Sequence, residues 1–108
     1  MKHFTRYIWF EDDNIEVEFT QHKSRQMFIS NVFDYNKHEI NLVMSYDTII
    51  GFIVDSKTFI TWGYSEYSCT TSKQITQLLY DYDLRMHRVK KFSYNDLEML
   101  VYYLGLVA

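Results

Sequence analysis

The sequence predicts an α+β domain in which an antiparallel β-sheet comes first and α-helices come last. Short stretches rich in aromatic and β-branched residues fill the first two thirds of the chain. Two segments with apolar residues at helical spacing follow them. Because strands followed by helices are typical of α+β proteins, we expect about five to six strands, with an N-terminal hairpin, and two C-terminal helices packed on one face.

Length and composition indicate one globular domain spanning residues 1–108. A chain of 108 residues is the size of a single domain. Its hydrophobic fraction of 47% and charged fraction of 23% are ordinary for folded proteins, so the chain can bury a core. The aromatic fraction, 19%, is high, which supplies core volume and leaves amphipathic tyrosine for a binding surface.

A β-hairpin is expected at the start of the chain. Thr5 to Phe10 is rich in aromatic and β-branched residues, and Ile15 to Phe19 alternates apolar with acidic residues. The Asp and Asn residues between them favour a turn. The segment Met27 to Phe33 is compatible with a helical face or a strand, and a strand is favoured because Ile, Val and Phe prefer β structure.

The continuous apolar run Ile49 to Val54 predicts a central strand buried on both faces. Gly51 within it indicates a bulge or a close approach of another backbone. Three further strands are expected at Glu39 to Tyr46, Thr58 to Trp62 and, at an edge, Tyr64 to Cys69.

Two helices are expected after these strands. Thr71 and Gln74 have the spacing of a capping box, and apolar residues at helical spacing follow, so the first helix is expected from about Ser72 to Val89. A second helix is expected between a start signal at Ser93 and Gly105.

No catalytic, metal or cofactor motif stands out in the sequence. The four histidines are scattered, the three glycines are isolated, and one cysteine makes no zinc signature. We therefore expect no enzyme activity, no metal and no cofactor. The enzyme alternative would use Cys69 as nucleophile with His87 as its base, although a lone cysteine is more often a buried apolar residue.

Two charged clusters are candidate binding sites. The acidic cluster lies at the hairpin tip and on its wet face, and either a solvated tip or a hard cation would explain it. The basic cluster would complement the C-terminal end of a helix dipole or bind phosphates of a nucleic acid. The acidic cluster comprises Glu11, Asp12, Asp13, Glu16 and Glu18, and the basic cluster comprises Arg85, Arg88, Lys90 and Lys91.

From the sequence, we expect a cytoplasmic location. The single cysteine allows no intramolecular disulfide. No stretch approaches the ~20 apolar residues of a membrane-spanning helix, and the first residues lack the apolar run of a signal peptide. No membrane association is therefore expected.

Two segments, Ser45 to Gly51 and Tyr67 to Ile75, resemble a paired pattern found in small, mostly uncharacterised proteins of bacteriophages and mobile elements of AT-rich Gram-positive bacteria. The first is similar to S-Y-x-T-x-I-A and the second to Y-S-x-T-T-S-K-H-I, with Gly51 and Gln74 as departures. The resemblance covers roughly Phe28 to Tyr80. It implies a phage setting, and hence the cytoplasm of a bacterial host cell.

Three functions follow as hypotheses. In the favoured one, a small phage-type accessory protein binds and inhibits a host protein, for example a CRISPR or restriction nuclease, through its acidic and aromatic surface. In the second, the stretch Arg85 to Lys91 binds nucleic acid, which the net charge of −3 disfavours. The third is the enzyme. The aromatic content also leaves room for a homodimer.

Overall fold

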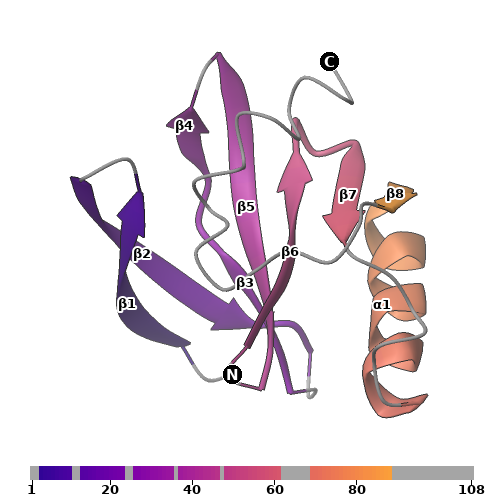
Figure 1. Cartoon of the computed structure of the whole chain (residues 1–108). Coiled ribbons are helices and arrows are strands. Elements are labelled where there is room, and N and C mark those ends of the chain that lie inside the picture. Colours follow the sequence, from indigo (N-terminus) through magenta and orange to yellow (C-terminus); the bar gives the residue numbers. More distant parts are fainter. Residues whose placement is uncertain are drawn as a thin grey trace.

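The structure, a computed structural model, describes residues 3–10, 13–23, 26–35, 37–46, 48–61 and 69–88. Within these residues one mixed sheet of eight strands carries a single helix on one of its faces (Figure 1). The strand order is β1-β2-β3-β5-β6-β7-β8, and β4 pairs with β5 beside this path. The elements are β1 (His3–Phe10), β2 (Asp13–Gln21), β3 (Met27–Ser30), β4 (Phe33–Tyr35), β5 (His38–Ser45), β6 (Thr48–Val54), β7 (Thr58–Thr61), α1 (Cys69–Tyr82) and β8 (Arg85–Arg88).

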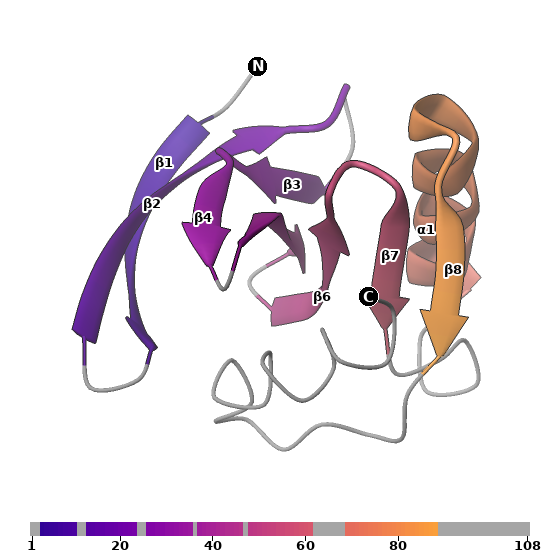
Figure 2. The same cartoon turned by 90° about the horizontal axis from the view of Figure 1, so that it is seen from above.

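The expectation of an α+β domain, with an antiparallel sheet followed by two helices, is wrong, because the described residues form mostly β-sheet with one helix. The helix expected from Ser72 to Val89 ends at Tyr82, and residues 85–88 form strand β8, which pairs with β7 in parallel. The sheet is therefore mixed, and β8 extends it beyond β7 (Figure 2). The expected second helix, and most of the expected edge strand from Tyr64 to Cys69, lie outside the described residues.

The early end of α1 has a local cause at Asp83. Its φ of 53° is left-handed, the conformation that terminates helices. The amide of Leu84 donates to the carbonyl of Leu79 at 2.9 Å, and that of Asp83 donates to Tyr80 at 3.4 Å. These two bonds form a Schellman motif, and Leu79 and Leu84 pack on the same core cluster, as the motif favours.

The start of α1 also differs from the expectation. The helix begins at Cys69, so Thr71 is inside it and is no N-cap. Gln74 is buried, and the hydroxyl of Ser45 donates to its Oε1 at 3.3 Å. Gln74 therefore links the helix to β5.

The expected N-terminal hairpin is confirmed. β1 pairs with β2 in antiparallel fashion over the whole length of β1, from His3 opposite Thr20 to Phe10 opposite Asp13. The strand favoured for Met27 to Phe33 is also confirmed, although it is divided into β3 and β4, which pair with different parts of β5.

Strand β6 is buried as expected, and Gly51 has both expected properties. Gly51 pairs with Val43 while Ile49 pairs with Met44, so Ile50 is the additional residue of a β-bulge. A Cβ on Gly51 would lie 2.2 Å from the carbonyl oxygen of Ile60, which shows the close approach of β7. The additional residue shifts, by one position, the alternation of β6 side chains between the two faces of the sheet.

The sheet separates two apolar clusters. On the helix side, residues of the sheet pack against Ile75 and Leu78, both fully buried. The other face is lined by Val17 and Phe19 of β2 together with residues of β3, β5, β6 and β7. The sheet residues of the helix-side cluster are Met27, Val43, Ile50, Ile53 and Phe59.

Candidate functional site

A hollow of about 510 Å³ lies where β2 and β3 meet the C-terminal end of α1. We call it the groove. Its lining combines acidic, basic, amide, hydroxyl and aromatic groups with one apolar residue, Ile29. The lining residues are Glu18, Thr20, Gln21, His22, Lys23, Ile29, Ser30, Asn31 and Tyr82.

Strand register orders the floor of the groove. Thr20 lies opposite Ile29 in the pairing of β2 with β3. Two residues further along the strands, Asn31 holds the end of the ladder: its amide donates to the carbonyl of Glu18 at 2.8 Å, and its Oδ1 accepts from the amide of Glu18 at 3.0 Å. The Asn31 side chain thus replaces a backbone carbonyl, and it fixes the backbone of Glu18 where β3 ends.

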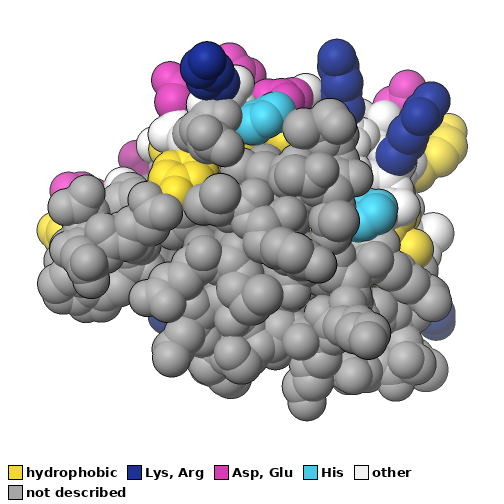
Figure 3. All heavy atoms as spheres, turned by 45° about the horizontal axis from the view of Figure 1, so that its top comes forward, with side chains coloured by type: hydrophobic (Ala, Val, Ile, Leu, Met, Phe, Trp, Pro, Cys, Tyr) yellow, Lys and Arg dark blue, Asp and Glu magenta, His cyan; other side chains and the backbone are white. Residues whose placement is uncertain are grey.

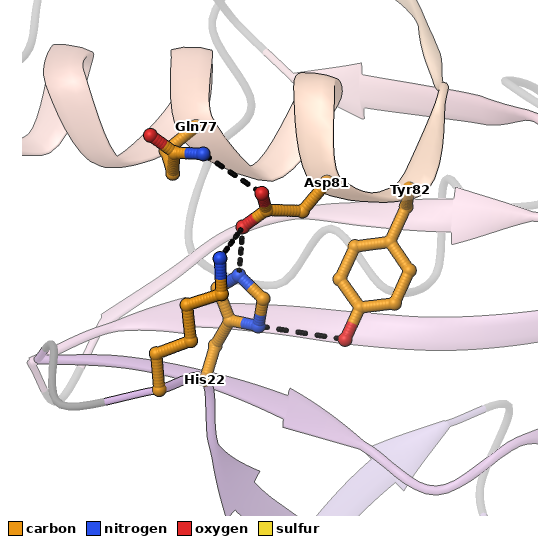
Figure 4. A network of polar contacts seen from close by, with 5 residues as sticks. His22, Gln77, Asp81 and Tyr82 are labelled. Carbon is orange, nitrogen blue, oxygen red and sulfur yellow. Dashed lines mark hydrogen bonds and ion pairs between the residues drawn. The ribbon is translucent and has the colours of Figure 1, made fainter.

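A polar network closes the other end of the groove (Figure 4). Asp81 of α1 accepts a hydrogen bond from Nε2 of His22 at 2.8 Å and from Nζ of Lys23 at 3.0 Å, both through Oδ2. Its Oδ1 accepts from Nε2 of Gln77 at 2.7 Å. The Tyr82 hydroxyl lies 3.4 Å from Nδ1 of His22. The network joins the β2–β3 connection to the last turn of the helix.

The network sets the protonation and orientation of its members. Because the carboxylate of Asp81 only accepts, Nε2 of His22 carries a proton and donates it in this hydrogen bond. Hydrogen bonds from Lys23, then Gln77, then His22 hold the pKa of Asp81 well below its ordinary value of 3.8. His22 is only 8% exposed, so the hydrogen-bonded pair of His22 and Asp81 is a fixed part of the fold.

We expect Asp81→Asn to lower the thermal midpoint by several degrees at pH 7. Since folding lowers the pKa of Asp81, its contribution is complete above pH 3.8 and is lost as the pH falls through the lower folded-state value. Thermal unfolding at pH 7 and at pH 2.5 measures this, and the difference between the two proteins should be smaller at pH 2.5, where part of the contribution is lost.

Asp83→Asn is the matched control, because Asp83 is exposed, lies two residues away and has a left-handed backbone that Asn tolerates. This variant should leave the thermal midpoint nearly unchanged at both pH values. An equal loss for Asp81→Asn at pH 7 and at pH 2.5 would contradict the role of the ionised carboxylate.

The structure brings part of the acidic cluster to one surface. Glu16 and Glu18 are exposed on β2, and Tyr7 of β1 lies directly opposite Glu16 and is 66% exposed. We call this surface the hairpin face. It comprises His3, Thr5, Tyr7, Glu16, Glu18 and Thr20, all exposed.

Glu18 is the member of this cluster that also lines the groove, and its carboxylate lies 3.4 Å from Nδ1 of His3. The backbone of Asp13 begins β2. Glu11 and Asp12 lie outside the described residues. On the face in Figure 3, Asp or Glu and Lys or Arg side chains are interspersed along one rim.

The structure corrects the setting of the basic cluster. Arg85 and Arg88 belong to strand β8 and not to the C-terminal end of a helix, so the helix dipole does not explain them. Arg85 is exposed, whereas Lys90 and Lys91 lie outside the described residues.

The enzyme and metal hypotheses gain no site in the described part of the chain. Cys69 begins α1 and His87 lies in β8. Among residues 3–10, 13–23, 26–35, 37–46, 48–61 and 69–88, no group of three His, Cys, Asp or Glu side chains could hold a metal ion. The described residues also contain no helix long and apolar enough to cross a membrane.

Sequence reasoning missed the network. A signal existed in Gln77 and Asp81, which are four residues apart and therefore neighbours on a helix. His22 and Lys23 join them across about 60 positions of sequence, which only the fold reveals.

Comparison with known proteins gives one match. The model of a family described as "Family of unknown function (DUF8033)" matches residues 15–96, which include β3 to β8, α1 and every residue of the groove. No curated protein matches, and no solved structure matches.

Proposed function

We propose, from the premise that this chain belongs to the family of unknown function DUF8033, that it acts by binding a partner protein through the hairpin face. The observation that carries the proposal is the pairing of Tyr7 with Glu16, exposed side by side, with Glu18 next along the strand. Exposed tyrosine is a frequent anchor of interfaces, and carboxylates on a rigid strand select a basic partner.

The partner class follows from the charge. A surface that displays carboxylates at fixed spacing complements the basic cleft of a partner protein that normally binds nucleic-acid phosphates. Together with the resemblance to phage proteins, this supports a small accessory protein that inhibits a host nuclease of the CRISPR or restriction type, in the cytoplasm of the bacterial host. Binding, without catalysis, is the proposed activity.

We expect Glu16→Lys with Glu18→Lys to abolish partner binding, because the double change replaces attraction with repulsion. A photo-crosslinking amino acid at position 7 should capture the partner from host lysate, and the same residue at the exposed position 57 should not. The captured protein is then identified and its binding to the purified variants is measured.

The matched control is Asp34→Lys with Glu39→Lys, which changes the net charge equally on the β4–β5 hairpin, where these two exposed residues are paired. Its binding should stay close to that of the unmodified protein. If both double variants bind alike, or if both positions crosslink the same protein, the hairpin face is not the binding surface.

One observation favours the nucleic-acid alternative: Arg85 is exposed on the terminal strand of the sheet order. A DNA and RNA titration at low salt separates the two functions, because phosphate contacts are strongest there. Affinity at low salt that Arg85→Ala reduces would support the alternative, and the absence of affinity would remove it.

A further inference from the structure

We infer that the groove is a receptor for one arginine side chain of the partner, with Glu18 binding the guanidinium. The inference rests on the proposed function and names the chemistry that the groove selects. It follows from three properties of the groove, which are its length, its wall and its charge.

The floor of the groove matches the length of an arginine side chain. Thr20 and Ile29 lie opposite one another in the middle, and the pair of Glu18 and Asn31 lies at one end. Two residues of strand span about 6.6 Å, close to the reach of an arginine from Cα to its guanidinium. An arginine stem that crosses the half-buried Ile29 therefore delivers its head to the carboxylate of Glu18.

Tyr82 provides a fixed wall for the stem. Its side chain is half exposed, and it lies against His22 with ring centroids 5.3 Å apart. His22 is in turn held by Asp81. Because the wall is already ordered, an entering side chain does not have to order it, which favours binding.

Among the charged side chains that line the groove, Glu18 is the one whose charge a bound cation would neutralise. The ammonium of Lys23 is paired with Asp81, so those two charges compensate each other. Glu18 contacts His3, but both side chains are more than half exposed, at 58% and 69%. A guanidinium binds a carboxylate through two parallel hydrogen bonds, which an ammonium cannot form, so arginine is preferred to lysine.

The test uses the purified full chain and a capped Gly-Arg-Gly tripeptide, followed by backbone amide NMR shifts. Shifts should concentrate at Thr20, Ile29 and Asn31. The matching lysine peptide should bind more weakly. The citrulline peptide, which has the same shape without the charge, should bind at least about tenfold more weakly.

Glu18→Gln should weaken arginine binding by about tenfold, since it removes the charge and keeps the size. Glu16→Gln is its matched control, because Glu16 is exposed on the same strand and face but does not line the groove. Tyr82→Phe keeps the wall and should change affinity little, whereas Tyr82→Ala should reduce it.

The inference is overturned if citrulline binds as well as arginine, if Glu18→Gln and Glu16→Gln behave alike, or if no shifts occur in the groove. Its failure is distinguishable from failure of the proposed function. If the tripeptide does not bind but the charge-reversed hairpin face still loses the partner, only the arginine site is wrong. If the tripeptide binds as expected and the partner ignores the charge reversal, the hairpin-face function is wrong.

Discussion

Gly51→Ala is expected to destabilise the fold by about 3 kcal/mol or more, at the upper end of the cost of overpacking a core. The added Cβ would lie 2.2 Å from the carbonyl oxygen of Ile60 and 2.8 Å from a ring carbon of Phe59. A ring can rotate away, but a backbone oxygen cannot do so without moving β7. Four residue pairs join β6 to β7, so the cost would spread along the ladder.

Urea unfolding of the variant measures this effect. Thr5→Ala is the control, because it introduces alanine at an exposed strand position, and it should stay within about 0.5 kcal/mol of the parent. A variant at position 51 that unfolds within about 1 kcal/mol of the parent would show that β7 relaxes easily.

Leu78→Ala is expected to cost about 3 kcal/mol, in the middle of the range for a buried leucine. Leu78 has no exposed surface, and it packs in the cluster between the helix and the sheet. Its removal leaves a cavity under α1, because the β-sheet on the other side cannot collapse into it.

The two following residues supply graded controls by urea unfolding. Leu79 is partly buried against the same cluster, so Leu79→Ala should cost less. Tyr80 is 83% exposed, so Tyr80→Ala should change stability by no more than about 0.5 kcal/mol. Equal losses at the three positions would contradict burial as the cause, and helix propensity could not explain them, because alanine is the strongest helix former.

Most of the sheet could be predicted from the sequence because its strands carry local signals. Val17 and Phe19 alternate with acidic residues, and Ile49 to Val54 is a short apolar run. Each of these patterns depends on neighbouring residues alone. Gly51 was informative for the same reason, since a glycine inside a strand often marks a bulge or a close backbone approach.

The end of the helix was not predictable in this way. Met86 continues the helical spacing of Leu78 and Tyr82, and the residue that stops the helix is Asp83, not the usual glycine. Strand β8 then depends on pairing with β7, a tertiary interaction. Such tertiary interactions override helix propensity, so the predicted helix extended beyond the observed end at Tyr82.

The same contrast between local and tertiary signals applies to the candidate site. The acidic character of Glu16 and Glu18 could be predicted, because charge and alternation are visible in the sequence. The groove could not, since it arises where β2, β3 and the end of α1 converge. Tyr82 looked like part of the apolar helix face, whereas it is half exposed and forms a wall.

The parallel pairing of β7 with β8 makes the edge of the sheet depend on the helix. β8 follows α1 after a short turn, and its first amide donates to the carbonyl of Lys57. Any opening that lifts α1 from the sheet also draws β8 away and turns β7 from an interior strand into a bare edge. Since unpaired edges recruit other strands, we expect the cluster around Ile75 and Leu78 to limit aggregation as well as to stabilise the fold.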